Sequence, residues 1–554
     1  MGVPGFFAWL KNKYKKDNFI LKKQQVNNVD YLLFDANGLV HPVCREIVIN
    51  NPDINNERLE TKMYIAIIEY MEKLIDLVDP KVAIYVAIDG VAPCAKIKQQ
   101  RMRRFKSIAD KILDDKIRKK HNKPIEPYWN TNAITPGTNF MEKLDERLIN
   151  WAKDNKRKII YSSWKEPGEG EHKLLHFMKD LKSNDLKQDL KSNDLKHVIY
   201  GLDADLIFLA LSADMKNIFL MREANQMDNK GDKNDFNFVS IDILKESIIV
   251  TMGEYIENLG FEFDNKRLIN DFIFLCYFLG NDFLPHLPAL DIHKSGIEYL
   301  IINYGKTLNE FMISRNKVKY LLKKSQQETA SKILNKKFLL SLLTKLALKE
   351  EETLKENYAK GKRFMRSEGD AYQLEKLKID NLQFKIEDPI AMGSDNMVDW
   401  RERYYRHYYG VEEDLEEFVE KLVEHYLMGI KWVTIYYFDN CPGWEWYFPF
   451  DHPPFLTDIV KYFKTFRFNK FKFTKCKALE PVQQLLTVLP PQSYMLLPEK
   501  FRKLMTNTNS SLAYLYPTEF TQDFINKTKY WMAIPNLPPL DIQLIKHIYE
   551  KYKN

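Results

Sequence analysis

Short apolar runs alternate with stretches of helical periodicity along the first part of the chain, up to about residue 295. Strands that alternate with helices in this way usually form a largely parallel sheet with helices on its faces. The pattern therefore predicts an α/β domain over residues 1–295. Its strands are expected at Tyr31–Phe34, Val82–Ile88, Ile159–Ser162 and Val198–Tyr200.

The pattern changes twice after this domain. Residues 296–380 are rich in lysine and carry scattered leucine and isoleucine, which predicts a helical connector. Residues 381–554 are dense in tyrosine and tryptophan and are interrupted by proline, which predicts a second, aromatic-rich α/β region packed against the first domain. A division is expected because 554 residues are too many for one hydrophobic core.

Composition narrows the class of protein. With 45% hydrophobic and 29% charged residues, the chain resembles ordinary soluble globular proteins. Its five cysteines are an odd number without a CxxC pair, which argues against a disulfide framework or a cysteine zinc site. The N-terminus does not read as a secretory signal, and the longest apolar run, Phe272 to Gly280, is too short to span a bilayer. We therefore expect a soluble, cytoplasmic protein without a membrane segment.

Carboxylates follow each of the predicted strands. In an open parallel sheet the loops that leave the carboxyl ends of the strands gather at one edge, where ligands bind. Six of these carboxylates are therefore expected to share one crevice, and Asp282 is expected to join them from a helix end. The full set is Asp35, Asp89, Glu169, Glu171, Asp203, Asp205 and Asp282.

A single acidic residue after a strand is more often a turn former or a helix cap. The pairs Glu169/Glu171 and Asp203/Asp205 favour a site instead, because a spacing of two suits side chains that leave extended or turning backbone on the same side. Crowded carboxylates repel one another unless cations neutralise them, and Mg²⁺ prefers oxygen ligands. The set predicts two Mg²⁺ ions, about 3.5–4 Å apart, that activate a water and stabilise the leaving oxygen in phosphodiester cleavage.

A basic segment, KIKQQRMRRFK, begins soon after Asp89. If a helix begins near Pro93, one of its faces carries cationic and amide side chains beside the carboxylates. Such groups can hold a terminal phosphate while the next linkage is cut, whereas the alternative is a solvated basic helix. The candidates for phosphate binding are Lys96, Gln100, Arg103 and Arg104.

Aromatic residues offer platforms for nucleic-acid bases. His41 follows Asp35 closely and is predicted either to stack on a base or to cap a turn. The segment Tyr436–Phe455 adds Trp444 and Trp446, whose indoles suit sequence-independent binding of a single strand. Aromatic density is more often part of a core, so most residues of this segment are expected to be buried.

Several long motifs occur in the order expected for one family of nucleases. In the first half they are MGVPGFFAWL, DANGLVH, IDGVAPCAKIKQQRMRRF, NAITPGTNFM, PGEGEHK, YGLDADLIFLAL and FLCYFLGNDFLPHLP. GIKWVTIYYFDNCPGWEWYFPFDHPPFLTDI, VLPPQSYMLLPEKFRKLM and YPTEF follow in the second half. The chain closely resembles the XRN family of 5′→3′ exoribonucleases over nearly its whole length.

This resemblance implies a PIN/flap-nuclease-like catalytic domain that degrades single-stranded RNA processively to nucleoside 5′-monophosphates. The seven carboxylates would hold two Mg²⁺ ions, for which Mn²⁺ could substitute. The four phosphate-binding candidates would line a pocket for a 5′ monophosphate that is too small for a triphosphate or a cap. His41 matches the family's base-stacking histidine, and either Trp444 or Trp446 would be its stacking tryptophan.

The chain departs from the family at Cys94, where Arg is usual, and at Ala36, where Met is usual. Neither is a proposed ligand, so these changes could tune the rate or the grip on RNA. We expect a compact member that contains the two core regions only, acts as a monomer and receives substrate from a decapping enzyme. The alternatives are a flap-type structure-specific nuclease and a catalytically inactive RNA-binding scaffold.

Overall fold

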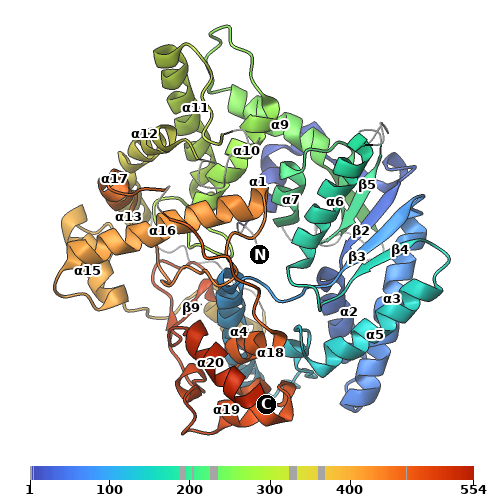
Figure 1. Ribbon diagram of the computed structural model, residues 1–554. Helices are drawn as coiled ribbons and strands as arrows, with labels where there is room; N and C mark the ends of the chain where they lie inside the picture. The colour runs from blue at the N-terminus through green and yellow to red at the C-terminus, as the bar shows by residue number, and fades with distance from the viewer. Residues whose placement is uncertain are drawn as a thin grey trace.

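The computed structural model describes residues 3, 5–187, 195–201, 205–224, 235–323, 334–359, 369–468 and 471–553, with the backbone alone for 182–187 (Figure 1). Of the seven predicted ligands, Asp203 lies outside the described residues. No described helix combines the length and the apolar character that crossing a membrane requires.

The described part of the first domain is built on a seven-stranded sheet in the order β1-β7-β6-β5-β2-β3-β4. The five strands β2 to β6 run parallel to one another. Strand β7 pairs antiparallel with β6, and β1 pairs antiparallel with β7 at the edge. The largely parallel sheet confirms the predicted α/β class. The strands are β1 (Ile20–Lys22), β2 (Tyr31–Asp35), β3 (Ala83–Ala87), β4 (Ile159–Ser162), β5 (His197–Tyr200), β6 (Ile218–Glu223) and β7 (Phe236–Ser240).

Helices cover both faces of this sheet because successive side chains of a strand point to opposite sides. Leu32 and Phe34 of β2 pack with one group of helices, whereas Leu33 packs with the other. The first group is α2 (Asn37–Asn50), α3 (Asn56–Val78) and α5 (Asn139–Asp154). The second group is α6 (Gly170–Lys187), α7 (Asp205–Ser212), α9 (Ile241–Gly253) and α10 (Asn265–Cys276) (Figure 1).

The hydrophobic core between the sheet and the second group of helices extends without a break into the rest of the chain. Short helix α1 (Phe6–Lys13) packs into it through the stacked pair Phe6–Phe208, whose ring centroids lie 4.3 Å apart. Helices from the predicted connector and from the last third also contribute to it, so these parts pack directly against the first domain. They are α11 (Gly296–Arg315), α12 (Lys336–Ala347), α13 (Glu350–Ala359), α15 (Met397–Tyr409), α16 (Leu415–Phe438) and α17 (Leu456–Phe463).

Helix α4 (Cys94–Lys120) joins the first domain to the end of the chain. Cys94, Ile97 and Phe105 pack with the C-terminal helices, and the buried Arg101 guanidinium donates to the Thr487 carbonyl at 3.1 Å. The region after residue 381 is mainly helical, and its described strands form one short antiparallel pair. Its remaining elements are α18 (Pro481–Val488), α19 (Glu499–Thr506), α20 (Ile542–Lys553), β8 (Gln522–Asp523) and β9 (Ile534–Pro535), while α14 (Ala371–Asp380) precedes it.

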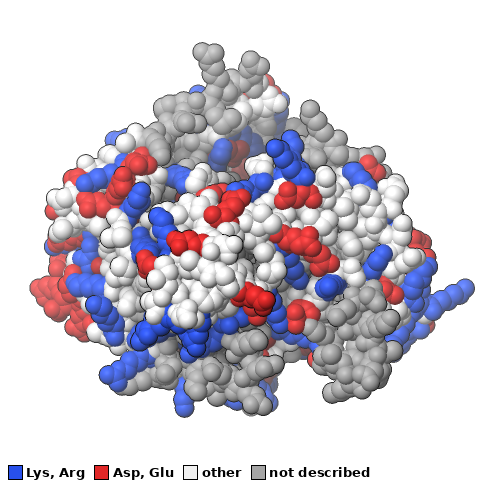
Figure 2. Space-filling model, turned by 90° about the horizontal axis from the view of Figure 1, so that it is seen from above, with Lys and Arg blue, Asp and Glu red and all other residues white. Residues whose placement is uncertain are grey.

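Charge is finely mixed on the face seen in Figure 2, where Lys and Arg side chains lie among Asp and Glu side chains. The net charge of +7 is therefore not concentrated into one broad field on this face.

Candidate active site

Carboxylates from several strands meet at the carboxyl edge of the sheet, as the sequence predicts. Asp35 is the last residue of β2, and Asp89 follows β3 by two positions. Between them lies Gly170, whose N–H donates to Asp89 Oδ1 at 2.6 Å. A Cβ at Gly170 would lie only 2.6 Å from Asp35 Oδ1 and 3.2 Å from Asp89 Oδ1. The missing side chain therefore lets the backbone of this loop approach both carboxylates.

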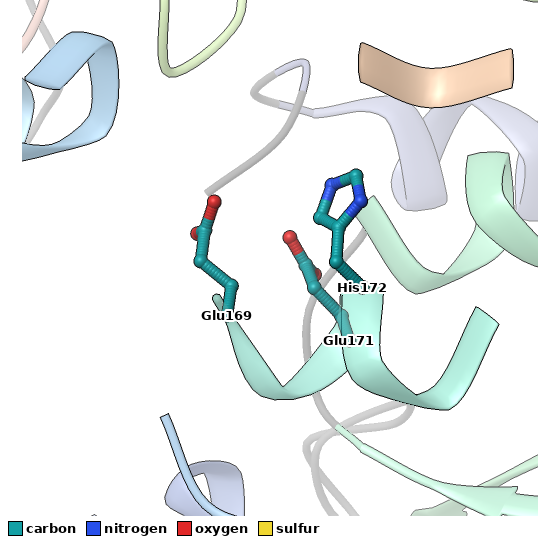
Figure 3. Close-up of side chains that lie close together, drawn as sticks. All are labelled: Glu169, Glu171 and His172. Carbon is teal, nitrogen blue, oxygen red and sulfur yellow. The ribbon is translucent and has the colours of Figure 1, made fainter. Parts of the chain in front are cut away.

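Glu169 and Glu171 flank Gly170 and point to the same side (Figure 3). Their carboxylates and the ring of His172 offer ligand atoms that all lie within 4.8 Å of one another, and all three residues are buried. The sequence placed both acids in a loop, but α6 begins at Gly170 and Glu171 lies in its first turn. The pair therefore converges at a loop–helix junction, where the chain direction changes between the two residues.

Lys96 lies inside the acidic group. Its ammonium contacts Glu169 Oε2 and Asp282 Oδ2, each at 2.5 Å. Although burial lowers the pKa of Lys96, the neighbouring carboxylates raise it well above its ordinary value. Burial raises the pKa of Asp282, yet the Lys96 ammonium holds it below its ordinary value. Asp282 thus joins the cluster as predicted, whereas Lys96 reaches into the carboxylates.

The cluster has more acid than its neighbouring cations neutralise. The pKa of Glu171 is raised well above its ordinary value by burial, and the charges of Asp205, Glu169 and Asp35 add to this effect. Burial likewise raises the pKa of Asp89. A set of crowded carboxylate oxygens with raised pKa values is suited to hard divalent cations, which replace the missing positive charge.

Two tyrosines of α16 contact this cluster from the second half of the chain. Tyr436 donates its hydroxyl to Glu169 Oε1 at 2.8 Å, and Tyr437 donates to Asp205 Oδ1 at 3.1 Å. The His172 ring lies 3.8 Å from the Tyr436 ring, centroid to centroid. These contacts were not predicted from the sequence, because an aromatic run also predicts simple burial.

The remaining phosphate-binding candidates lie on α4, which begins at Cys94 as expected from Pro93. Arg103 is exposed, and Arg104 is half-buried. Burial and the charge of Arg103 lower the pKa of Arg104 to about 9. Within the described residues, Arg104 Nη1 and Gln100 Oε1 are buried without a hydrogen-bond partner. An unpartnered buried group is costly unless a ligand satisfies it. The Arg104 donor fits an anion, whereas the Gln100 oxygen is an acceptor and needs a ligand that donates.

The stacking candidates have different surroundings. His41 is exposed on α2. Trp446 stacks on Trp432 with ring centroids 5.4 Å apart and is packed into the aromatic core. Trp444 is half-buried, and its carbonyl accepts the Cys94 N–H at 2.7 Å. The Trp446 ring therefore contributes to the packing of the core, and Trp444 is the better candidate for contact with a base.

The two departures from the family pattern lie at structural positions. Cys94 is buried at the first turn of α4, among the helices that follow residue 479. Ala36 is also buried and donates its N–H to the Ala87 carbonyl at 3.0 Å. Both residues adjoin the candidate site without contributing a ligand atom to it.

Comparison with known proteins gives a match over almost the whole chain. Residues 1–224 match the XRN 5′-3′ exonuclease N-terminus, and residues 262–335 and 312–554 match the Xrn1 helical domain. The chain is 31% identical to human 5′-3′ exoribonuclease 1 over 588 residues, which cover 98% of this chain and 33% of the human protein. It is 29% identical to 5′-3′ exoribonuclease 2 of Candida albicans, covering 100% of this chain and 72% of that protein.

Among solved structures, the catalytic core of Rad2 in complex with DNA covers 63% of this chain, at 13% identity and a TM-score of 0.30. A similarity this low carries no argument about mechanism. The chain spans a third of the human relative and a larger part of the fungal one.

Proposed function

Because this chain belongs to the family of XRN 5′-3′ exonucleases, we propose that it is a processive 5′→3′ exoribonuclease. It hydrolyses single-stranded RNA from a 5′-monophosphate end to nucleoside 5′-monophosphates. The observation that carries this proposal is the group of carboxylates at the carboxyl edge of the sheet, in which Glu169 and Asp282 share one ammonium, that of Lys96.

The carboxylates are the ligands that two Mg²⁺ ions require. When bound, the ions would supply a hydroxide and take up charge at the scissile phosphate. The donor set fits hard cations because its members are oxygens that crowd together without enough positive charge of their own. The proposed ligands are Asp35, Asp89, Glu169, Glu171, Asp203, Asp205 and Asp282.

Residues of the chain orient the set. Gly170 holds Asp89 through its N–H, and the hydroxyls of Tyr436 and Tyr437 hold Glu169 and Asp205. A carboxylate oxygen can accept more than one partner, so these contacts leave acceptor capacity, although the second oxygen of Glu169 also contacts the Lys96 ammonium. Groups that fix a ligand's direction in this way typically change metal affinity about 10–100-fold when they are removed.

The 5′ phosphate is bound one helical turn further along α4. Gln100 lies four residues after Lys96, and Arg103 and Arg104 occupy the next turn on the same face. The unpartnered Nη1 of Arg104 donates to a phosphate oxygen, and the exposed Arg103 adds charge. Terminal phosphate and scissile phosphate are thereby held a fixed distance apart, which sets the length of the product to one nucleotide.

Bases of the leading nucleotides stack on His41 and Trp444. After each cut the shortened RNA again ends in a 5′ phosphate, so every turnover restores the group that the pocket binds. Processive degradation follows from this chemistry. Use of Mn²⁺ in place of Mg²⁺, a monomeric state, supply of substrate by a decapping enzyme and cytoplasmic action remain predictions.

The test uses 3′-labelled single-stranded RNAs that differ only in a 5′ monophosphate, triphosphate or hydroxyl, each with Mg²⁺ or with EDTA. We expect only the monophosphate RNA to be converted to mononucleotides, and only with Mg²⁺. Equal attack on all three ends would favour a flap-type nuclease. Binding without cleavage under every condition would favour an inactive scaffold.

A matched variant tests the pocket. Arg103→Ala should reduce the preference for the monophosphate over the hydroxyl end by about tenfold, because one charge-assisted contact is lost. Lys116→Ala, on the same helix but beyond the pocket, serves as the control. An unaltered preference in Arg103→Ala would refute the assignment.

A further inference from the structure

A groove of about 760 Å³ lies between α2 and α4 and is lined by His41 and by two exposed aromatic residues, Tyr128 and Trp531. The side chains of Tyr128 and Trp531 are 51% and 56% exposed. We propose that this groove binds the single-stranded RNA on the 3′ side of the active site, with bases stacked on Tyr128 and Trp531. The inference rests on the proposed function, since it gives the substrate of the same site a longer path.

The groove continues the phosphate-binding face of α4. Gln100 and Arg104 lie on one face of this helix, and Ser107, Lys111 and Asp114 follow at spacings of three or four residues. These last three residues line the groove. From Ser107 to Ile117 the helix rises about 15 Å, enough to border several nucleotides.

His41 connects the groove to the proposed binding site of the leading nucleotides. It is the predicted base-stacking residue of the leading nucleotides, and it also lines the groove. An RNA whose first bases stack on His41 must leave the site past this residue. The groove is thus the surface that the next nucleotides meet.

Three of the four acidic residues that line the groove, Asp110, Asp114 and Glu126, form ion pairs, which reduces their repulsion of an entering strand. Asp114 accepts from Arg118 Nε at 2.6 Å and from Lys376 Nζ at 2.9 Å. Asp110 is paired with Lys106 at 2.8 Å. With most of this acidic charge paired, the exposed aromatic faces are available to a ligand.

The two aromatic residues come from distant parts of the chain. Tyr128 lies shortly after α4, where Lys111 Nζ lies 4.8 Å from its ring centroid. Trp531 lies in a short 3₁₀ helix, Tyr530–Met532. Large exposed rings that meet in one groove mark an interaction site. Stacking on such rings accepts any base, as an exonuclease that reads every sequence requires.

The test measures binding by the full-length chain in an Asp205→Asn background, which slows cleavage. Two 5′-phosphorylated RNAs are compared, one of about 4 nucleotides and one of about 12, because single strands bind through sites of this size. Tyr128→Ala and Trp531→Ala should each weaken binding of the longer RNA about tenfold and leave the shorter RNA unchanged. Tyr128→Phe and Trp531→Phe should retain most of the affinity, because they keep a ring.

An exposed tyrosine outside the groove provides the control. Tyr552 is 47% exposed on α20, and Tyr552→Ala should change neither affinity. A second substrate series replaces bases of the longer RNA by abasic sites at positions beyond the leading nucleotides. Wild-type affinity for the abasic RNA should fall about tenfold, and the alanine variants should lose nothing more.

Failure of this inference is distinct from failure of the proposed function. If the alanine variants bind long and short RNA as the wild type does, the groove is not the path of the RNA. If they lose affinity equally for normal and abasic RNA, the contact is not base stacking and the inference is overturned. Equal binding of the short 5′-phosphorylated RNA and a matched 5′-hydroxyl RNA, measured beside it, would instead count against the proposed function alone.

Discussion

Buried carboxylates occur in two regions of this molecule, and they are treated differently. In the helical region, which comprises helices α10 to α17, Asp271 on α10 accepts three hydrogen bonds, from the backbone N–H groups of Leu321 and Leu322 at 2.8 Å and from the Tyr304 hydroxyl at 2.7 Å. Glu350 accepts the N–H groups of Leu456 at 2.7 Å and Thr457 at 2.8 Å. Each of these acids has donors of its own.

At the sheet edge two of the acids share one cation. One ammonium, that of Lys96, serves both Glu169 and Asp282. The pKa of Glu171 is raised first by burial and further by the charges of other carboxylates, a cause that the pKa of Asp271 lacks. A nearby second lysine, Lys173, donates to the carbonyls of Ile88 and Ser163 at 2.8 Å.

The difference separates structural acids from acids that await a cation. A buried carboxylate that is individually saturated stabilises the fold, because its removal strands the donors around it. Carboxylates that crowd together destabilise one another and gain from a divalent cation. Substitution should therefore damage function at the sheet edge and stability in the helical region.

The largest expected effect is at the sheet edge. Asp205→Asn keeps an acceptor for the Tyr437 hydroxyl but removes the charge, so turnover on 5′-phosphorylated RNA should fall at least about 10³-fold. In buffer without Mg²⁺ the midpoint of thermal unfolding should not fall, because a repulsive charge has been removed. Asp53→Ala, at an exposed position, is the control. Turnover within tenfold of the wild type would remove Asp205 from the proposed ligands.

The converse is expected of Asp271. Asp271→Ala leaves two backbone N–H groups and the Tyr304 hydroxyl without their acceptor, so the free energy of unfolding should fall by about 3–4 kcal/mol. Denaturant unfolding followed by circular dichroism measures this change. Turnover below the unfolding transition should remain near that of the wild type. A variant as stable as the wild type would show that the contrast between the two regions is wrong.

The buried Glu350 makes the stability of the chain depend on pH. Burial raises the pKa of Glu350 from 4.5 to about 7, so the folded chain keeps a proton that the unfolded chain releases. The stability that this proton provides is fully present below pH 4.5 and is lost as the pH rises to about 7. Between these pH values the free energy of unfolding of the wild type should fall by up to about 3 kcal/mol because of Glu350. Glu350→Gln cannot titrate at this position, so this part of the fall should be absent.

Thermal unfolding of both proteins at several pH values measures the change. Glu352→Gln, at an exposed position on the same helix, should follow the wild-type profile. If the profile of Glu350→Gln also matches that of the wild type, Glu350 does not titrate in this range.

Part of this contrast could be predicted from sequence. Strand ends followed by acids identify the sheet-edge group, because the geometry of a parallel sheet brings the carboxyl ends of its strands together. All four predicted strands are present as β2, β3, β4 and β5, with small differences in their bounds. Strands β1, β6 and β7 were not predicted. Strand β1 has only three residues, and β1 and β7 pair antiparallel at the edge of the sheet, outside the parallel strand pattern on which the prediction was based.

The supporting contacts could not be predicted. Helical spacing placed Lys96 on the same face of α4 as Arg104, but spacing does not say how far into the acidic group a side chain reaches. The hydroxyl of Tyr436 meets Glu169 across 267 positions of sequence, and that of Tyr437 meets Asp205 across 232. Such contacts arise from tertiary packing of α16 and leave no local signal.

Tyr436 provides the smallest and most specific test, since it joins the helical region to the sheet edge. Tyr436→Phe keeps the ring against His172 and removes only the donor to Glu169. Half-saturation by Mg²⁺ should require about tenfold more of the ion, because a group that orients a ligand has been lost. Turnover at saturating Mg²⁺ and the midpoint of unfolding should stay close to the wild type.

The matched control is Tyr426→Phe on the same helix, whose hydroxyl donates to the Pro285 carbonyl at 3.3 Å. It should leave the Mg²⁺ requirement unchanged, because its partner is a backbone group. If both variants shift the requirement equally, the effect comes from α16 as a whole and not from the hydroxyl on Glu169. If neither shifts it, the helical region supports the sheet edge by packing alone, and the two regions are coupled through shape rather than through this hydrogen bond.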